Sequence, residues 1–516
     1  MDRRSGILMH LSSLPGPFGS GGLGRNAERF ADFLKESGFR VWQVLPTTPT
    51  DRSSNYSPYS SQSAFAGNQI FVSPEKLVED GLLEDEEVAK IEHDGLECRA
   101  DFDRSTILIK SMLNLAWRHL KNEPEKFHGL LEDYYCFIES EKYWLQDYAL
   151  FTVLKKKFDG LPWNKWPQEF AQRDKEALEN FIVQKETCEA VEFIYFGQYI
   201  LYRQWKAFHL YCSEKDIKLM GDIPMFAALD SSDVWSNQKY FDLDYDGFPN
   251  KVAGVPPDYF SNKGQRWGNP LYNWENMQKD GYGWWVSRFK KALENFDLLR
   301  IDHFRGFSAC WAIPVCEETA ENGQWIETPG RELLAVLADK IQKNDAAELP
   351  LIAEDLGIIT DDVRGLMNLF GLPGMKVLLF AFNDDVASNP YAPHNHVPGS
   401  VVYTGTHDNN TVRGWWENES DERSRSLVSQ YTVREITKEN VAEVFAVMAL
   451  SSTSKVAIVP MQDILGLGTD SRMNVPGVAQ GNWLWRIGIK DFEELIGADS
   501  EISARFKKLN SLYGRR

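Results

Sequence analysis

Residues 298–306 have the sequence Leu-Leu-Arg-Ile-Asp-His-Phe-Arg-Gly, a short apolar run that changes into polar residues. A run of this length predicts a buried strand, with Asp302 and His303 at its carboxyl end. Arg300 lies two residues before Asp302, so both side chains point to the same side of the strand. A nearby guanidinium keeps a carboxylate ionised, as a covalent nucleophile requires. The same pair could instead tie the strand end to a loop, and this stretch alone leaves both interpretations open.

Seven further apolar runs have the length of a buried strand, and polar residues follow most of them. They span residues 7–11, 41–46, 217–222, 349–355, 375–382, 400–408 and 456–463. Helical patterns lie between most of the runs, for example over 331–343, 361–370 and 439–449. Eight strands with crossover helices is the count of a (β/α)₈ barrel, whose active site lies at the carboxyl ends of the strands. We therefore predict an α/β fold, a (β/α)₈ TIM barrel with large, mainly helical insertions.

The chain has 516 residues, which on average would suggest three or four domains. One barrel with insertions can occupy the same length. Residues 69–215 are charged, mostly helical in period and rich in Trp and Tyr, and they contain no linker-like or repeated stretch. We predict a single catalytic barrel over 1–516, with 69–215 as a helical insertion between its second and third strands.

The charge of the chain excludes some classes of partner. It has 56 Lys and Arg against 75 Asp and Glu, a formal net charge of −19. A negative chain without a polybasic run is not expected to bind nucleic acid or anionic membranes. The six cysteines are sparse and form no C-x-x-C pair, which indicates reduced thiols and a cytoplasmic protein. We expect neither a signal peptide nor a membrane span.

Residues 19–24 fit the pattern G-x-G-x-x-G, which suggests a dinucleotide site. Seven residues, two of them prolines, separate the first glycine from the preceding strand, whereas the fingerprint follows its strand directly. The next strand ends at Pro46, without the acidic residue that would hold a ribose. We therefore do not expect a nucleotide cofactor.

Three acidic residues follow predicted strands: Asp302, Glu354 and Asp408. Such a set is typical of glycosidic chemistry, in which a retaining enzyme needs one carboxylate as nucleophile and one carboxylic acid as proton donor. Asp302 is the candidate nucleophile because of Arg300. The apolar approach to Glu354 should raise its pKa, as a general acid requires. Asp408, in a dense polar cluster, could hold sugar hydroxyls and stabilise a cationic transition state.

Short sequence motifs are spread over nearly the whole chain. They are Gly6–His10, Ser13–Gly16, Ser57–Tyr59, Ser63–Asn68, Gly221–Pro224, Ala253–Phe260, Trp267–Pro270, Arg300–Gly306, Ala353–Gly357, Thr406–Thr411, Arg472–Asn474 and Gly481–Trp483. In this order they resemble the 4-α-glucanotransferases called amylomaltases, or disproportionating enzymes, of the α-amylase clan. The resemblance implies a barrel enzyme that transfers α-1,4-glucan segments, by a retaining double displacement, to the 4-hydroxyl of another glucan or of glucose.

The resemblance also implies roles for single residues. Asp302 would form a covalent glucosyl ester, Glu354 would act as acid and then base, and Asp408 would bind the distorted sugar. The residues matched to substrate contacts are Tyr59, Asp258, Trp267, Arg300, His303, Phe380, His407 and Asn482. Asp258 and Trp267 belong to a predicted insertion over 226–295 that covers the cleft. No metal or organic cofactor is implied. The expected partners are maltooligosaccharides and amylose, and we expect a monomer or homodimer.

Two other functions compete with transfer. An α-glucan hydrolase would use the same three carboxylates, and only a cleft cover that excludes water would favour a sugar acceptor. A catalytically inactive glucan-binding scaffold would not need all three. His10 could either line the cleft or cap a strand. The Trp pairs at 163/166, 284/285 and 415/416 are expected in the core, whereas Gly264, Gly268 and Pro270 predict that Trp267 lies in a loop, where an exposed aromatic favours binding.

Overall fold

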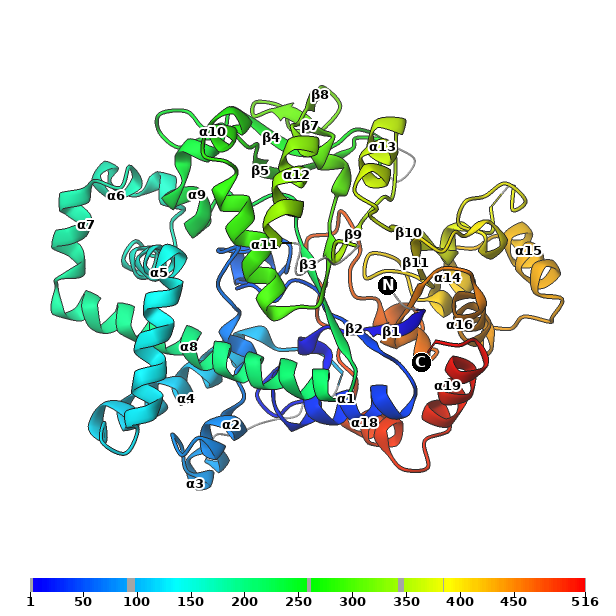
Figure 1. Ribbon diagram of the computed structural model, residues 1–516, viewed down its shortest axis with the longest axis horizontal. Helices are drawn as coiled ribbons and strands as arrows, with labels where there is room; N and C mark the ends of the chain where they lie inside the picture. Colours follow the sequence, from blue (N-terminus) through cyan, green and yellow to red (C-terminus); the bar gives the residue numbers. More distant parts are fainter. Residues whose placement is uncertain (1–2, 91–97, 258–260, 342–347, 384, 516) are drawn as a thin grey trace.

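The computed structural model describes residues 3–90, 98–257, 261–341, 348–383 and 385–515 (Figure 1). Within these residues one parallel sheet has the strand order β10-β11-β12-β1-β2-β3-β6-β9. Its strands are β1 (Arg4–Leu8), β2 (Val41–Gln43), β3 (Lys218–Ile223), β6 (Leu298–Ile301), β9 (Leu351–Ala353), β10 (Gly374–Val377), β11 (Ser400–Tyr403) and β12 (Val456–Pro460). The two ends of this order meet where the Ala353 N–H of β9 donates to the Pro373 carbonyl, 2.9 Å away, just before β10. The sheet is the predicted (β/α)₈ barrel.

Each predicted strand overlaps one strand of this barrel, but the predicted run 7–11 misses the first three residues of β1, and several predicted runs extend too far. Residues 375–382 leave the strand after Val377 and continue as a short 3-10 helix, η7 (Leu378–Phe380). Residues 404–408, predicted within a strand, form the loop that follows β11. Side-chain hydrogen bonds within this loop replace the strand ladder, because Thr406 donates both its N–H and its hydroxyl to Asn409.

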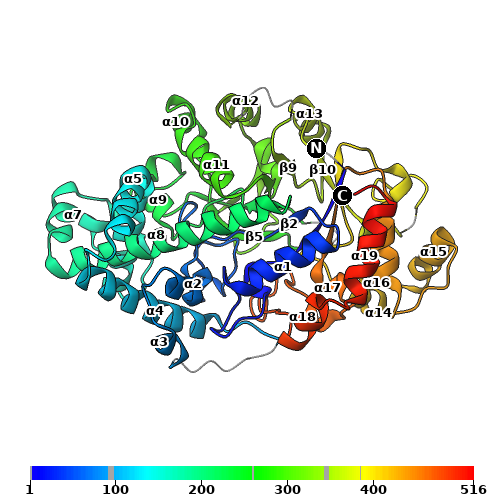
Figure 2. The same ribbon diagram turned by 60° about the horizontal axis from the view of Figure 1, so that its bottom comes forward.

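Helices connect and surround the strands. They are α1 (Arg25–Glu36), α2 (Pro74–Glu79), α3 (Asp85–Ala89), α4 (Phe102–Asn122), α5 (His128–Lys157), α6 (Gln168–Ala171), α7 (Lys175–Ile182), α8 (Lys185–Glu214), α9 (Ser232–Ser236), α10 (Trp274–Lys279), α11 (Gly283–Asn295), α12 (Gly330–Ile341), α13 (Asp361–Leu369), α14 (Val412–Asn418), α15 (Glu422–Thr432), α16 (Val441–Ser451), α17 (Met461–Ile464), α18 (Ile489–Ile496) and α19 (Glu501–Leu512). Figure 2 shows α1, α18 and α19 side by side on the outside of the barrel.

Helix α1 illustrates how the sequence pattern becomes packing. Its buried face consists of Ala27, Phe30, Ala31, Phe33 and Leu34. The spacing of these residues places them on one stripe of the helix, toward the strands. The helix stops at Ser37, and Gly38 then takes a φ of 81°, a left-handed conformation that favours glycine.

The helices α2 to α8 lie between β2 and β3 in the chain, within the predicted helical insertion. The long helices α5 and α8 pack against each other at the side of the barrel (Figure 1). The tryptophans at 163, 166, 284 and 285 are buried, as expected, whereas Trp415 and Trp416 are only partly buried. No helix in the described part of the chain is both long and apolar enough to cross a membrane.

A second, antiparallel sheet was not predicted from the sequence. Its order is β5-β4-β7-β8, with β4 (Lys251–Val255), β5 (Gln265–Pro270), β7 (Ala309–Pro314) and β8 (Gln324–Glu327). Two of its strands come from the connection after β3 and two from the connection after β6. The prediction that Trp267 lies in a loop is wrong, because Trp267 is part of β5. Pairing with β4 holds this polar segment extended, and Gly254 permits it because a Cβ there would lie 2.1 Å from the Gln265 carbonyl.

Candidate active site

The three predicted carboxylates all follow strands of the barrel. Asp302 comes directly after β6 and Glu354 directly after β9. Ile301 and Ala353 are paired in the parallel register, and the Glu354 N–H donates to the Ile301 carbonyl at 3.1 Å. Neighbouring strands lie about 4.8 Å apart, so Asp302 and Glu354 start from adjacent backbone positions. Asp408 belongs to the loop after β11, at the same end of the barrel.

Arg300 joins two carboxylates. Its Nη2 donates to Asp302 Oδ1 at 2.9 Å, and its Nη1 donates to Asp222 Oδ2 at 2.6 Å. Burial alone would lower the Arg300 pKa, but Asp222 and Asp302 hold that pKa well above its ordinary value. The predicted pair of Arg300 and Asp302 therefore exists, and it is one arm of a larger network.

Asp222 is a site residue that sequence reasoning did not select. It lies at the end of β3, in register with Arg300 on β6, and its side chain is fully buried. Tyr59 donates its hydroxyl to Asp222 Oδ2 at 2.8 Å. Burial raises the Asp222 pKa, and the charge of Arg300 opposes this shift. The signal in the sequence was an acidic residue within a buried strand, since such a charge requires a partner.

Tyr59 connects this network to the Asp408 loop. Its ring stacks on His407, with centroids 5.0 Å apart and an interplanar angle of 13°. His407 Nε2 lies 3.4 Å from Asp408 Oδ1. Burial raises the pKa of the Tyr59 hydroxyl well above its usual value, and the negative charges of Asp302 and Asp408 raise it further. Three distant segments of sequence therefore converge at one end of the barrel.

Glu354 has the environment of a proton donor. Its Oε2 accepts from the His303 N–H and its Oε1 from the Leu356 N–H, each at 2.8 Å. Burial raises its pKa to about 7, although the nearby Arg300 lowers it. A carboxyl group with this pKa can release and recover a proton near neutrality. The direction of the shift agrees with the expectation from the apolar residues before Glu354.

Asp408 is held by hydrogen bonds from two neighbouring residues, and its side chain is partly exposed to solvent. Its Oδ1 accepts from Asn474 Nδ2, and its backbone carbonyl accepts from Arg472 Nη2, each at 2.6 Å. Its side chain is 45% exposed, so oxygen lone pairs remain available to a ligand. Neither Arg472 nor Asn474 was selected as a site residue, although both lie in one of the motifs quoted above.

His303 and Trp267 lie together at the edge of the site. Their rings meet edge to face, with centroids 4.8 Å apart. Trp267 is 38% exposed, so part of its indole faces outward from β5. Burial lowers the His303 pKa to about 4, which leaves its imidazole neutral at pH 7. The second predicted residue of the cleft cover, Asp258, lies outside the described residues.

Phe380 and Asn482 are less directly connected to the carboxylates. Phe380 is partly buried and contacts Tyr391 edge to face, at 5.5 Å between centroids. The Asn482 amide is used within its own loop, because it accepts from the Val475 N–H and donates to the Val478 carbonyl. The Asn482 side chain thus stabilises its own loop. Contacts of Phe380 and Asn482 with a glucan stay predictions.

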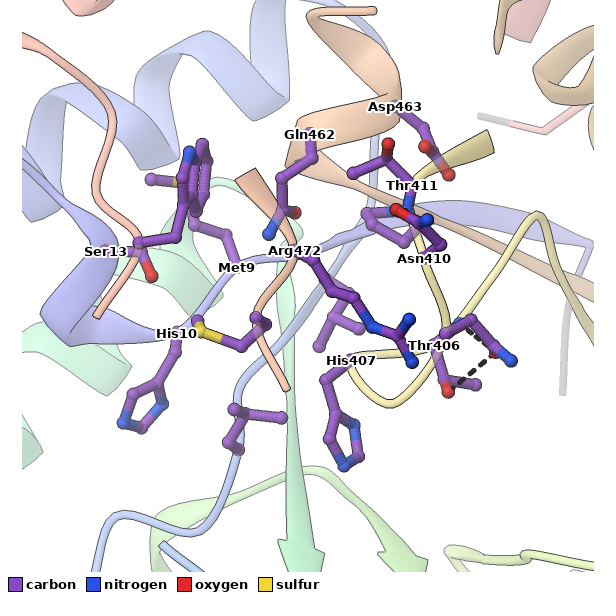
Figure 3. A pocket seen from close by; sticks show the side chains of 16 residues that line it. Met9, His10, Ser13, Thr406, His407, Asn410, Thr411, Gln462, Asp463 and Arg472 are labelled. Atoms are coloured by element: carbon purple, nitrogen blue, oxygen red, sulfur yellow. Dashed lines mark hydrogen bonds between the residues drawn. The ribbon is translucent and has the colours of Figure 1, made fainter. Parts of the chain in front are cut away.

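A cavity with about 430 Å³ of empty space, part of it open to solvent, lies beside His407 (Figure 3). Its polar lining includes His10, Ser13, Thr406, Gln462 and Arg472. His10 lines this cavity, but Asp302, Glu354 and Asp408 do not, so the two positions considered above for His10 both stay predictions. Burial and the nearby His407 lower the His10 pKa to about 3. Across the described residues, no group of three or more His, Cys, Asp or Glu side chains could hold a metal ion.

Comparison with known proteins decides the family. A family model described as 4-alpha-glucanotransferase matches residues 9–490. The chain belongs to this family. The 4-alpha-glucanotransferases of Aquifex aeolicus and Thermus thermophilus are each 43% identical to it, over 513 and 498 residues. The alignments cover 99% of both chains for the first and 94% of this chain and 95% of the relative for the second.

Solved structures agree with this assignment. The amylomaltase of Streptococcus agalactiae in complex with acarbose has a TM-score of 0.91 and 34% identity, with 99% of each chain covered. The amylomaltase of Corynebacterium glutamicum has a TM-score of 0.74 at 16% identity, covering 98% of this chain and 75% of its own, and supports the fold alone. The predicted family, the enzyme class and the barrel are therefore confirmed. The chain is an enzyme of the 4-alpha-glucanotransferase class.

Proposed function

We propose that the enzyme transfers α-1,4-glucan segments by a retaining double displacement through a covalent glucosyl ester on Asp302. The observation that carries this proposal is the contrast between two carboxyl groups at adjacent strand ends. Asp302 is bonded to the Arg300 guanidinium, whereas Glu354 is bonded to backbone N–H groups and has a pKa raised to about 7 by burial. One nucleophile and one proton donor are what a retaining mechanism requires.

In the first step, an Asp302 oxygen attacks the anomeric carbon of the donor glucan. The glycosidic C–O bond breaks, and Glu354 gives its proton to the departing oxygen. In the second step, the 4-hydroxyl of an acceptor attacks the same carbon and returns its proton to Glu354. The ester bond to Asp302 breaks, and the carboxylate is restored. Asp408 accepts hydrogen bonds from hydroxyls of the distorted sugar, which stabilises the cationic transition state.

Several residues are proposed to hold the reacting sugar. Arg300, His303 and His407 surround Asp302 and Asp408, and Tyr59 supplies an aromatic surface next to His407. Trp267 and Phe380 are proposed as aromatic contacts farther along the glucan, with Asp258 and Asn482 as polar ones. The neutral His303 can donate or accept a hydrogen bond without adding charge to the site.

Transfer is favoured over hydrolysis by the antiparallel sheet beside the carboxylates. Trp267 on β5 contacts His303 directly, so this sheet lies close to Asp302. A cover at that place would exclude water from the ester and leave room for a sugar acceptor. We propose that residues 226–295 act as this cover and that 69–215 is a helical insertion in one catalytic barrel.

The proposed partners are maltooligosaccharides and amylose, without a metal or organic cofactor, and the proposed assembly is a monomer or homodimer. One of the solved relatives holds acarbose. We also propose a cytoplasmic location, because all six cysteines are free in the structure and four of them are exposed.

The test is to incubate the pure protein with maltotriose alone and to separate the products by size. Transfer predicts glucose together with a ladder of products longer than maltotriose. Glucose and maltose with nothing longer would mean hydrolysis. If maltotriose stays unchanged, maltoheptaose separates a transferase that needs a longer donor from an inactive scaffold.

A further inference from the structure

The loop that carries His407 and Asp408 begins and ends at one buried carboxylate. Asp463 lies on α17, directly after β12, at the carboxyl end of the barrel. The Thr404 hydroxyl, where the loop leaves β11, donates to Asp463 Oδ2 at 2.6 Å. The Val412 N–H, where the loop enters α14, donates to Asp463 Oδ1 at 2.8 Å. Figure 3 shows Asp463 at the edge of the cavity beside Thr411, which precedes Val412.

Other bonds fix the inside of this loop and also reach its two junctions, because the Thr404 carbonyl accepts from the Leu379 N–H at 3.3 Å and the Thr411 hydroxyl accepts from the Gly414 N–H at 3.0 Å. Asn409 accepts from the N–H and the hydroxyl of Thr406. Asn410 donates to Glu419, which also accepts from Arg472. These contacts hold the loop in one shape and tie its middle to the segment after α17. Asp463 adds one further bond at each end of the loop, and both of these bonds are made to the same side chain.

The choice of an acid at position 463 is not explained by packing. Asp463 is 3% exposed, and within the described residues no hydrogen bond or ion pair links it to a Lys, Arg or His. Its burial raises its pKa to about 6. A buried carboxylate without a cation is unfavourable, and a well-packed apolar side chain would be more stable. The two carboxylate oxygens supply a simultaneous bond to both ends of the loop, which an apolar side chain could not make.

We propose that Asp463 is a positioning residue that holds both ends of the Thr404–Val412 loop and thereby fixes the Asp408 carboxylate in the cleft. The inference rests on the proposed function, in which Asp408 binds the distorted sugar. Asp463 touches neither sugar nor reacting atoms, so it acts through Asp408. Because Asp408 acts mainly in the transition state, loosening the loop lowers kcat more than it raises KM.

The first test compares Thr404→Val with Thr404→Ser. Valine removes the hydroxyl donor at nearly constant volume, whereas serine keeps it. The account predicts that Thr404→Val lowers kcat on maltotriose between about tenfold and a hundredfold, with KM within about twofold. Thr404→Ser should stay within about twofold of the wild type. Asp463→Ala should show the larger loss, and Thr404→Val keeps the test decisive if Asp463→Ala does not fold.

Asp297→Asn is the matched control. Asp297 also accepts from a backbone N–H, that of Leu219, and from a side chain, His209, but it lies before β6 at the amino end of the barrel. Its kcat should equal that of the wild type. If Asp297→Asn lowers kcat as much as Thr404→Val does, the effect is a general loss of packing and the proposal is overturned.

A double variant separates this inference from the proposed function. If Asp463 acts through Asp408, Thr404→Val causes no further loss of kcat in the Asp408→Asn background. Full additivity of the two losses would overturn the inference. If Thr404→Val has the kcat of the wild type while Asp408→Asn is impaired, only the positioning role of Asp463 is overturned. An unimpaired Asp408→Asn overturns the proposed role of Asp408, and the positioning role with it.

Discussion

The hydroxyl of Tyr59 donates a 2.8 Å hydrogen bond to the buried carboxylate of Asp222. The two residues are 163 positions apart in the chain. Their bond ties the long loop after β2 to the end of β3, and Asp222 passes the link on to Arg300. One continuous network therefore runs from Tyr59 to the candidate nucleophile Asp302.

The first prediction concerns this bond. Tyr59→Phe removes this donor and leaves the Asp222 carboxylate bonded to Arg300. Because the acceptor is charged, we expect the free energy of unfolding to fall by about 1.5–3 kcal/mol. Tyr403→Phe is the control, since its hydroxyl donates to the neutral amide of Gln43. Its loss should be about 0.5–1.5 kcal/mol. Urea unfolding of both variants measures the difference, and equal losses would contradict a charged acceptor.

The second prediction concerns the nucleophile. Asp302→Asn is nearly isosteric but cannot form the ester, so we expect kcat on maltotriose to fall at least about a thousandfold. Binding of maltotriose to the variant, measured by calorimetry, should persist and show that the cleft is intact. Turnover at the wild-type rate would remove Asp302 from the mechanism.

The third prediction concerns the pH dependence of activity. In the proposed mechanism the first step needs protonated Glu354, and burial raises the pKa of this group to about 7. The value of kcat/KM should therefore decline as the pH rises through about 7. Initial rates between pH 5 and 9 measure this limb. If kcat/KM began to decline only above about pH 9, the proton donor would be a group other than Glu354.

The fourth prediction concerns the pH dependence of stability, to which the carboxyl group of Glu354 contributes. The pKa of Glu354 is raised in the folded state from 4.5 to about 7, so folding favours its protonated form. Its contribution to stability is therefore largest at low pH and is lost as the pH rises from about 4.5 to 7. Glu354→Gln lacks this loss. The variant should gain stability relative to the wild type between pH 5 and pH 8, by no more than about 3 kcal/mol. Urea unfolding at both pH values would show no such gain if Glu354 were not desolvated.

The fifth prediction concerns the cleft cover. Trp267→Ala should weaken glucan binding more than it lowers the melting temperature, because the indole is 38% exposed and lies against His303. Trp325, on β8 of the same sheet and 37% exposed, is the matched control. Trp325→Ala should leave the affinity for glucan unchanged. A large loss of melting temperature with normal binding for Trp267→Ala would make it a structural residue.

The sequence was informative where a signal lies within a few residues. The apolar runs located all eight barrel strands, because buried parallel strands are nearly continuous in hydrophobicity. The spacing of Arg300 and Asp302 predicted their contact, because alternate residues of a strand share a side. The apolar residues before Glu354 predicted the direction of its pKa shift.

What the sequence did not reveal depends on pairing between distant segments. The strands of the antiparallel sheet are short and partly polar. In addition, β4 pairs with β7 although the barrel strand β6 lies between them in the chain. Trp267 was therefore assigned to a loop. Asp222 was overlooked because its partners Tyr59 and Arg300 meet it only through the register of β3 and β6. Asp463 is the last residue of a predicted strand, and its bonds to Thr404 and Val412 could not be predicted because they join three separate segments of the chain.

The central claim, a covalent glucosyl ester on Asp302, can be tested by trapping it. Glu354→Gln lacks the base needed for the second step, and an activated donor such as a maltotriosyl fluoride needs no acid for the first. The account predicts that mass spectrometry finds a maltotriosyl adduct on the peptide that contains Asp302, and none in the Asp302→Asn/Glu354→Gln double variant. An adduct on another carboxylate, or products of inverted anomeric configuration, would contradict the account.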